Sequence, residues 1–372
     1  MATKRIVVKI GSSSLTNTHG EIDMKQLEDH VHALALLHQN NMEVILVSSG
    51  AIAAGFKQLG YSSRPVTQKG KQAAAAVGQG LLIQTYMEKL KEYDITAAQI
   101  LLTRSDFSNQ GRYRNAYATM EELLERRVIP IINENDTIAI EELTFGDNDM
   151  LSALVSGLIH ADHLIILTDI NGIYDKNPNR YPDATRYDHF MKISEELIEQ
   201  TDATGSKVGT GGMKSKLMAA KMASSVGIPV FIGRGDGEQK LADILKGKGD
   251  GTYIDSERKA HLPANKQWIS LHSHLDGRVV VDEGAENALM HQGSSLLSPG
   301  VTTVEGYFSK GDVVEVYGKS ALLGRGQVNC SSEELEAVMK LRQSDYIPAV
   351  PTIEVIHRDK WVSMMTMKGE LS

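Results

Sequence analysis

Two lysines lie beside glycine- and serine-rich turns, and this combination suits phosphate binding. Lys9 ends an apolar run, and Gly11 follows two residues later. The segment GTGGMKSK at residues 209–216 opens a helical pattern that contains Lys216. Backbone N–H groups of such turns and a nearby ammonium together attract phosphate oxygens. The alternatives are an ordinary strand-to-helix turn with a surface lysine and an exposed loop.

A second turn, VSSGAIAAG at residues 47–55, leads from an apolar run into a helix of small residues. Ser49, or the serine before it, can cap this helix, and Gly50 and Ala51 follow. The N–H groups at a helix start attract a carboxylate or a phosphate. We therefore expect this turn to bind an anionic group of a substrate. The alternative is a capping turn with close helix packing.

Short polar side chains are dense in residues 132–153, INENDTIAIEELTFGDNDMLSA. Their amides can hold an α-carboxylate and an α-ammonium, and their carboxylates can hold Mg²⁺ or orient lysines. The alternative is a pair of turns and a helix cap. The side chains in question are Asn133, Asn135, Asp136, Asp147, Asn148 and Asp149.

The segment LTDINGIYDKNP, residues 167–178, places Thr168 and Asp169 at the end of an apolar run, before a glycine turn and a tyrosine. This arrangement suits recognition of the base or ribose of a nucleotide. The alternative is a turn at a strand end that the aspartate caps.

The sequence lacks the motifs of other common phosphate-binding, hydrolase and zinc sites. The chain contains no G-x-x-x-x-G-K-[ST], no complete G-x-G-x-x-G and no G-x-S-x-G. No set of cysteines and histidines has zinc spacing, and we assign no residue as a metal ligand. Cys330 is the one cysteine, and we interpret it as a small buried residue. His272 and His274 lie in a polar stretch and are interpreted as solvated.

The elements that must position these residues alternate between strands and helices over roughly the first 255 residues. This order predicts an α/β fold with an open, mostly parallel sheet between helices, which binds ligands at the carboxyl edge of its strands. The predicted strands are 5–10, 43–47, 96–102, 128–132, 163–167 and 229–232. The predicted helices are 24–39, 51–59, 69–91, 112–125, 148–160, 213–224 and 239–245.

The pattern changes in the last third of the chain. Segments from residue 276 to about 356 are short, rich in β-forming residues and separated by glycine turns, which predicts a small β-rich domain with one helix at 332–341. We expect a large domain at 1–256, a polar linker at 257–275, the small domain at 276–357 and a tail at 358–372.

Composition favours a soluble protein of the cytoplasm. The 372 residues are 41% hydrophobic and 23% charged, with a net charge of −8. No apolar run is long enough for a transmembrane helix, and no signal peptide is expected. The negative charge argues against general affinity for nucleic acids or acidic membranes. A local cluster of lysines, Mg²⁺ and backbone N–H groups can still bind an anion.

In this order, six segments resemble the amino acid kinase family: KIGSSSL, VSSGAIAAG, INENDT, GDND, LTD-x-x-G-x-Y and GTGGMKSK. Within that family they are similar to the kinases that phosphorylate the side-chain carboxylate of glutamate. The segments DEGA and QGSSLLSPGV of the small domain resemble the PUA domain that many of these bacterial enzymes carry. The resemblance covers nearly the whole chain.

The resemblance implies a phosphotransferase with a carboxyl group as acceptor. It converts ATP and L-glutamate into ADP and L-glutamyl 5-phosphate in the first step of proline biosynthesis, with Mg²⁺. Catalytic roles fall on Lys9, Lys216, Asp149 and Asp147. Nucleotide binding falls on Lys9, Gly11, Ser12, Thr168, Asp169, Thr210, Gly211, Gly212, Met213, Lys214, Ser215 and Lys216. Glutamate binding falls on Ser49, Gly50, Ala51, Asn133, Asp136 and Asn148.

The chemistry of this reaction agrees with the residue types. A side-chain carboxylate titrates near 4.3 and is already a nucleophile at neutral pH. The obstacle is its repulsion of the γ-phosphate, so the site needs positive charge and alignment. Two lysines and no histidine base meet this need.

The resemblance also implies a homo-oligomer, a dimer or a tetramer, and feedback inhibition by proline. Handover of the labile product to a glutamyl phosphate reductase is a further expectation.

Rival interpretations are a kinase of the same family acting on acetylglutamate, aspartate, carbamate or a nucleotide, an inactive amino-acid sensor, and an RNA-binding protein. The small domain opposes the last of these, because residues 276–357 hold 6 basic and 12 acidic side chains.

Overall fold

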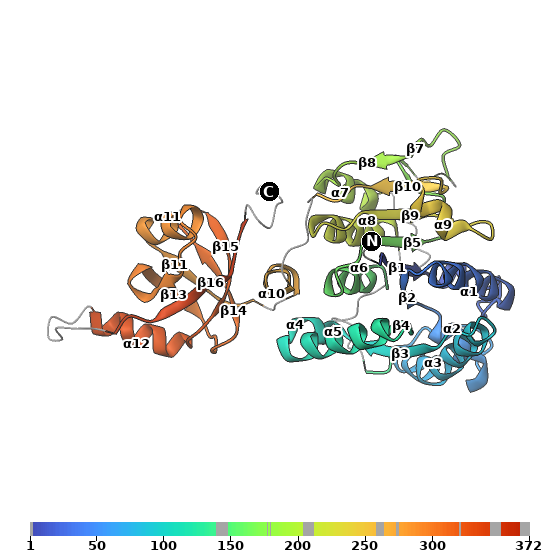
Figure 1. The fold of residues 1–372 in the computed structure, drawn as a ribbon, viewed down its shortest axis with the longest axis horizontal. Coiled ribbons are helices and arrows are strands. Elements are labelled where there is room, and N and C mark those ends of the chain that lie inside the picture. Colours follow the sequence, from blue (N-terminus) through green and yellow to red (C-terminus); the bar gives the residue numbers. More distant parts are fainter. Residues whose placement is uncertain are drawn as a thin grey trace. The chain divides into compact units, whose positions relative to one another are not determined.

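The computed structural model describes residues 3–138, 148–176, 178, 180–203, 212–257, 264–272, 275–319, 321–342 and 351–364. The chain divides into two compact units (Figure 1). The first comprises residues 1–106 and 112–261, and the second comprises 107–111 and 262–372. The domain boundaries expected from the sequence stay a prediction, but the polar stretch near residue 260 lies close to this division.

An eight-stranded sheet forms the centre of the first unit, in the order β3-β4-β2-β1-β5-β9-β10-β8. All neighbouring pairs are parallel except β10 with β9. The mostly parallel α/β fold predicted from the sequence is therefore confirmed. The strands are β1 (Arg5–Ile10), β2 (Glu43–Ser48), β3 (Ala97–Leu102), β4 (Ile129–Glu134), β5 (His163–Leu167), β8 (His189–Phe190), β9 (Val230–Gly233) and β10 (Gly251–Ile254).

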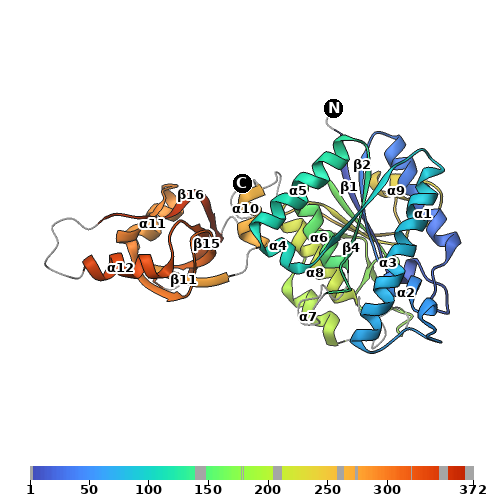
Figure 2. The same cartoon turned by 90° about the horizontal axis from the view of Figure 1, so that it is seen from below.

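Helices cover both faces of this sheet, with α1, α3 and α9 on one side and α5, α6 and α8 on the other (Figure 2). A small hairpin of β6 (Ile173–Tyr174) and β7 (Arg186–Tyr187) lies outside the sheet. The helices are α1 (Met24–Gln39), α2 (Ala51–Gly55), α3 (Gln68–Lys91), α4 (Arg104–Ser108), α5 (Gln110–Glu125), α6 (Asn148–Leu158), α7 (Glu195–Ala203), α8 (Met213–Ser225) and α9 (Lys240–Leu245).

The central strand β1 explains why the sheet forms where it does. Its β-branched residues pair in register with β2 on one side and with β5 on the other. Five of its six residues are buried, as in strands covered on both faces. Its carboxyl end therefore meets the carboxyl ends of β2, β4 and β5 at one edge.

Two predicted helices end earlier than expected. The helix predicted at 51–59 is the short α2, followed by the 3₁₀ turn η2 (Lys57–Leu59). The helix predicted at 148–160 ends at Leu158, because His160 adopts a positive φ of 52° that a helix does not allow.

The second unit contains a six-stranded sheet in the order β12-β16-β15-β14-β11-β13, as the predicted β-rich domain requires. Its core includes Val279, Val314 and Val328. The strands are β11 (Leu275–Val281), β12 (Leu296–Leu297), β13 (Val301–Gly306), β14 (Val313–Tyr317), β15 (Leu322–Val328) and β16 (Glu354–Ser363). The helices are α10 (Ala264–Gln267), the π-helix η4 (Trp268–His272), the 3₁₀ turn η5 (Ser298–Gly300), α11 (Glu283–His291) and α12 (Ser332–Arg342).

The prediction of a single helix in this unit was wrong. The segment after β11 forms α11, because the Asp282 side chain caps it by accepting a hydrogen bond from the Ala285 N–H group. The polar stretch before β11 also contains helix, and Trp268 is buried there with its indole N–H donated to the Phe107 carbonyl at 2.9 Å. Strand β16 extends to Ser363, into the predicted tail, because Trp361 and other apolar residues near its end are buried.

Candidate active site

A carboxylate joins two buried lysines at the carboxyl edge of the sheet. Lys9, at the end of β1, places its Nζ 2.6 Å from Asp149 Oδ1, and Lys216, on α8, places its Nζ 3.0 Å from Asp149 Oδ2. Ser215 Oγ donates a hydrogen bond of 2.8 Å to the same Oδ2. All three charged residues are at most 7% exposed. The group carries a net charge of +1, which suits a site for a polyanion.

The turn after β1 lies against this lysine pair. Gly11 precedes the 3₁₀ turn η1 (Ser12–Ser14), and a Cβ at Gly11 would lie 3.2 Å from Lys9 Nζ. The absent side chain thus lets the backbone approach the ammonium closely. His30, on α1, supports this turn: its Nε2 lies 3.0 Å from the Ser14 carbonyl oxygen. Burial lowers the pKa of His30 to about 4, so this contact is made by a neutral ring that donates from Nε2.

The ends of β2 and β4 and the helices α3 and α6 contribute to a network of amides beside the lysines. Asn148, the first residue of α6, directs Nδ2 at three acceptors: the Ser48 carbonyl at 2.6 Å, Ser49 Oγ at 3.0 Å and Asn133 Oδ1 at 2.7 Å. Asn133, on β4, donates in turn to Gln79 Oε1 at 2.8 Å. The network fixes Ser49 and both asparagines, which are predicted glutamate-binding residues.

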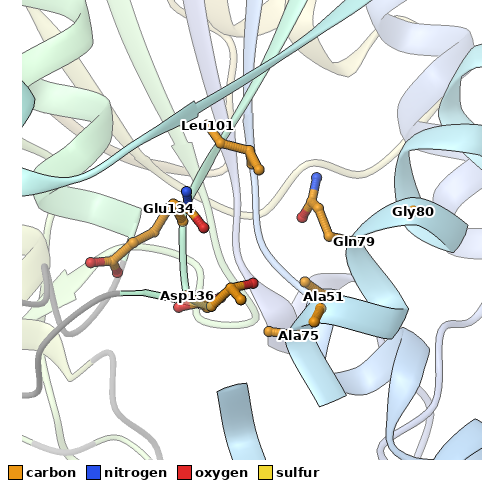
Figure 3. A pocket seen from close by; sticks show the side chains of 10 residues that line it. Ala51, Ala75, Gln79, Gly80, Leu101, Glu134 and Asp136 are labelled. Carbon is orange, nitrogen blue, oxygen red and sulfur yellow. The ribbon is translucent and has the colours of Figure 1, made fainter. Parts of the chain in front are cut away.

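A pocket of about 210 Å³ opens next to this network (Figure 3). Asp136 lies on one side of it and Gln79 faces across from α3, with Ala51 and Ala75 between them. Burial raises the pKa of Asp136 to about 6, although the charge of Arg64 opposes this shift. The remaining lining residues are Ala76, Gly80, Leu101, Glu134, Asn135 and Thr137.

The loop that follows β5 lies next to the turn after β1. Thr168 Oγ1 and Ser13 Oγ both donate to Asp169 Oδ1, at 3.1 Å and 3.4 Å. Arg234 Nε donates to the Asp169 carbonyl at 2.7 Å. Thr168 is buried, and Asp169 is exposed. The predicted nucleotide-binding pair therefore lies at the same edge as Lys9.

The remaining predicted residues lie on the elements already described. Gly50 has a φ of +105° before α2, which favours glycine. Gly212 caps α8 without a side chain, and Met213 and Lys214 occupy the first turn of that helix. Ser12 lies in η1 beside Gly11. Three predicted residues lie outside the described residues: Asp147, Thr210 and Gly211.

Sequence reasoning missed several neighbours of the site. Gln79 and Leu101 line the pocket from α3 and β3, and Arg234 supports the loop after β5. Arg234 lies in the glycine-rich segment GRGDG at residues 233–237, and Gln79 lies between Gly78 and Gly80, so local glycine content could have drawn attention to both, whereas Leu101 carries no such signal. Among the residues that the structure describes, no group of three or more His, Cys, Asp or Glu side chains could hold a metal ion.

The model of the amino acid kinase family matches residues 4–234, more than half of the chain. The chain belongs to the amino acid kinase family. This amino acid kinase also matches the PUA domain over residues 277–348. Both resemblances inferred from the motifs are thus confirmed. Of the helices that the structure describes, none has the length and apolar character needed to cross a bilayer.

Relatives of this amino acid kinase match over its whole length. It is 66% identical to "Glutamate 5-kinase" of Oceanobacillus iheyensis over 370 residues, which cover 100% of both chains. It is 59% identical to "Glutamate 5-kinase 1" of Bacillus subtilis, over 98% of this chain and 100% of that protein. A solved structure, carbamate kinase from Giardia lamblia bound to AMP-PNP, aligns with a TM-score of 0.51 at 18% identity and covers 68% of this chain and 99% of that one. The last comparison supports the fold alone.

Proposed function

We propose that this kinase transfers the γ-phosphoryl group of ATP to the side-chain carboxylate of L-glutamate. The products are ADP and L-glutamyl 5-phosphate, an acyl phosphate at the start of proline biosynthesis. The observation that carries this proposal is the full-length match, at 66% and 59% identity, to two proteins named as glutamate 5-kinases. The buried lysine pair supports it independently, because it supplies what transfer to an anionic acceptor requires.

The lysine pair addresses the electrostatic obstacle of the reaction. An ionised carboxylate must approach a γ-phosphate that is itself negative, and phosphoryl transfer is catalysed mainly by alignment and charge stabilisation. Asp149 holds the ammonium groups of Lys9 and Lys216 on its two oxygens. It keeps both cations in place before the substrates bind, so little reorganisation is needed in the transition state.

In the reaction, a carboxylate oxygen of glutamate attacks the γ-phosphorus, and the bond to the β,γ-bridging oxygen of ATP breaks. The electron pair of that bond leaves with ADP, and no proton has to be removed from the nucleophile. Lys9 and Lys216 neutralise charge that spreads over the transferred group and the leaving oxygen. The Gly11 backbone adds a donor at close range, because no side chain stands between it and Lys9.

Mg²⁺ is proposed to enter with ATP as the magnesium–nucleotide complex. Both oxygens of Asp149 are already engaged by lysines and by Ser215. That carboxylate therefore fits the task of orienting the lysines better than that of a metal ligand. A Mg²⁺ ion bound with the nucleotide would supply additional positive charge near the leaving group.

Glutamate is proposed to bind in the pocket beside the amide network. The Asp136 carboxylate would attract the α-ammonium, and Ser49 with Asn148 would orient the carboxylates. The pocket touches Ala51 and Gln79, and Gln79 is bonded to Asn133, so the pocket is continuous with the network that leads to Asp149. This geometry would place the side-chain carboxylate toward the lysines.

Several finer properties are proposed on the resemblance alone. These are assembly into a dimer or tetramer, feedback inhibition by proline, a cytoplasmic location and handover of the product to a glutamyl phosphate reductase. Measuring mass in solution and repeating the kinase assay with added proline test the first two.

A panel of acceptors tests the proposed function. ADP release is measured with MgATP and, in separate reactions, glutamate, aspartate, acetylglutamate, carbamate or UMP. We expect release to depend on glutamate and to exceed release with every other acceptor by at least about 100-fold in kcat/KM, since a polar site rejects poorly matched groups strongly. A higher kcat/KM with another acceptor would overturn the proposal that glutamate is the substrate.

A further inference from the structure

The hydroxyl of Thr252 joins two segments that are far apart in the chain. Thr252 lies on β10 and is 0% exposed. Its Oγ1 accepts a hydrogen bond of 2.8 Å from the Ile173 N–H group and donates one of 2.5 Å to the Tyr187 carbonyl. Both partners belong to the hairpin of β6 and β7. One buried hydroxyl thus holds both strands of that hairpin against β10 of the sheet.

The chain approaches Thr252 too closely for any residue except glycine at position 172. Gly172 has a φ of +124°, and a Cβ there would lie 2.7 Å from Thr252 Oγ1 and 3.2 Å from the Thr252 backbone nitrogen. Both the backbone conformation and the space require glycine. The hydrogen bond from the Ile173 N–H group therefore fixes the bend formed by residues 169–172, the reversal that begins at Asp169.

A second set of contacts holds the same reversal from outside. Arg186 forms an ion pair with Asp250 and donates to the Asn171 carbonyl at 3.2 Å. The Asp250 carbonyl accepts from the Arg234 N–H group at 3.0 Å, and Arg234 Nε donates to the Asp169 carbonyl at 2.7 Å. Residues 250–252 thus support the loop after β5 at both of its ends.

We propose that Thr252 is a positioning residue for the nucleotide. Through Ile173 and the reversal at Gly172 it fixes the backbone of residues 169–172, on which the base or ribose of ATP is held. Thr252 itself does not touch the nucleotide. The inference rests on the proposed function, because that function assigns Thr168 and Asp169 to ATP.

The test compares Thr252→Val, which keeps the shape and removes the hydroxyl, with Thr252→Ser, which keeps the hydroxyl. Valine leaves the Ile173 N–H group and the Tyr187 carbonyl without their buried partner, so the hairpin is released. We expect Thr252→Val to raise the Kd for MgADP and the KM for ATP at least tenfold, with the KM for glutamate within twofold of the parent. Thr252→Ser is expected to stay within about threefold in all three quantities.

A milder variant, Arg186→Met, removes the outer support and is expected to raise the Kd for MgADP about threefold. If Thr252→Val does not fold, Arg186→Met provides the test. An unchanged Kd for MgADP in folded Arg186→Met would then overturn the proposal. Folded Thr252→Val with the parental Kd, an equal rise in both KM values, or a loss in Thr252→Ser as large as in Thr252→Val would also overturn it. Failure of the proposed function is distinguishable: the parent protein would bind MgADP but show no glutamate-dependent turnover.

Discussion

At the level of single residues, the central feature of the site is one carboxylate, that of Asp149, which pairs with two lysines. A buried ammonium without a partner is strongly unfavourable, and Asp149 pairs with both Lys9 and Lys216. Both ammonium groups are thereby held where they can interact with a phosphoryl group that binds between the acceptor and the leaving group. The same carboxylate therefore serves stability and leaves the catalytic charge available.

Replacing either lysine of the pair should abolish most turnover. We expect Lys9→Met and Lys216→Met to lower kcat by more than about 100-fold, comparable to losing one donor to a transition-state charge. The measurement is steady-state ADP release by variants whose folding is verified by circular dichroism. Lys221→Met serves as the control, because Lys221 lies on the same helix but pairs with Glu195. Near-parental kcat in a folded Lys9→Met protein would refute the assigned role.

Glutamate binding should weaken in mild acid because of Asp136. Its pKa of about 6 means that the carboxylate is ionised at pH 7.5 and mostly protonated at pH 5.5. The protonated form does not attract the α-ammonium, so the KM for glutamate should rise roughly fourfold between these pH values. In Asp136→Asn the KM should be high and nearly constant over the same range. A parental KM that does not change with pH would contradict the assignment.

The same carboxyl should lower stability at neutral pH. The folded state raises the pKa of Asp136 above its ordinary value of 3.8, so the folded protein binds this proton more tightly than the unfolded chain. Its contribution to folding is greatest in acid and falls as pH rises through 6. Asp136→Asn should therefore be more stable than the parent, by roughly 1 kcal/mol more at pH 7.5 than at pH 5. Urea denaturation at the two pH values measures the difference, and a constant offset would contradict it.

At the level of elements, close packing of α2 on α3 positions one wall of the pocket. A Cβ at Gly78 would overlap the Ala51 carbonyl oxygen, and one at Gly55 would overlap the Ala74 carbonyl oxygen. These glycines let two helix backbones approach without side chains between them. Ala51 and Gln79, which neighbour the contact, line the pocket.

Two glycines of α3 should respond oppositely to alanine. Gly78→Ala places a methyl group on the backbone of α2 and should destabilise the protein by about 3 kcal/mol. A Cβ at Gly80 has nothing within 4 Å, so Gly80→Ala should stabilise the helix by about 0.5–1 kcal/mol. Urea denaturation of both variants gives the comparison. Equal effects at the two positions would show that the helices do not approach as closely as described.

The strongly periodic elements could be predicted from the sequence, and the short ones could not. Strand β1 and helix α1 have the predicted bounds, because the first is a continuous β-branched run and the second has a capping aspartate, Asp23. Strand β8 has two residues and no apolar period, so nothing in its sequence marks it. Helix α11 was missed because the β-branched valines at the end of β11 run directly up to its capping residue, Asp282.

At the scale of the whole molecule, the site could be predicted where residues follow central strands. Lys9, Ser49, Asn133 and Thr168 lie at or just after the carboxyl ends of strands that the sequence identifies, and parallel strands bring these ends to one edge. Gln79 and Thr252 could not be predicted in this way. The first lies in the middle of a helix, and the second lies on β10, where the hydrogen-bond partners of its hydroxyl are 79 and 65 residues away in the chain.

The central claim is that this chain forms an acyl phosphate on the side chain of glutamate. Its most direct test is to incubate the protein with MgATP, glutamate and hydroxylamine and to identify the product by mass spectrometry. We predict glutamate 5-hydroxamate in an amount equal to the ADP released, and almost none from Lys9→Met. ADP release without hydroxamate, or hydroxamate formation that is independent of ATP, would contradict the account.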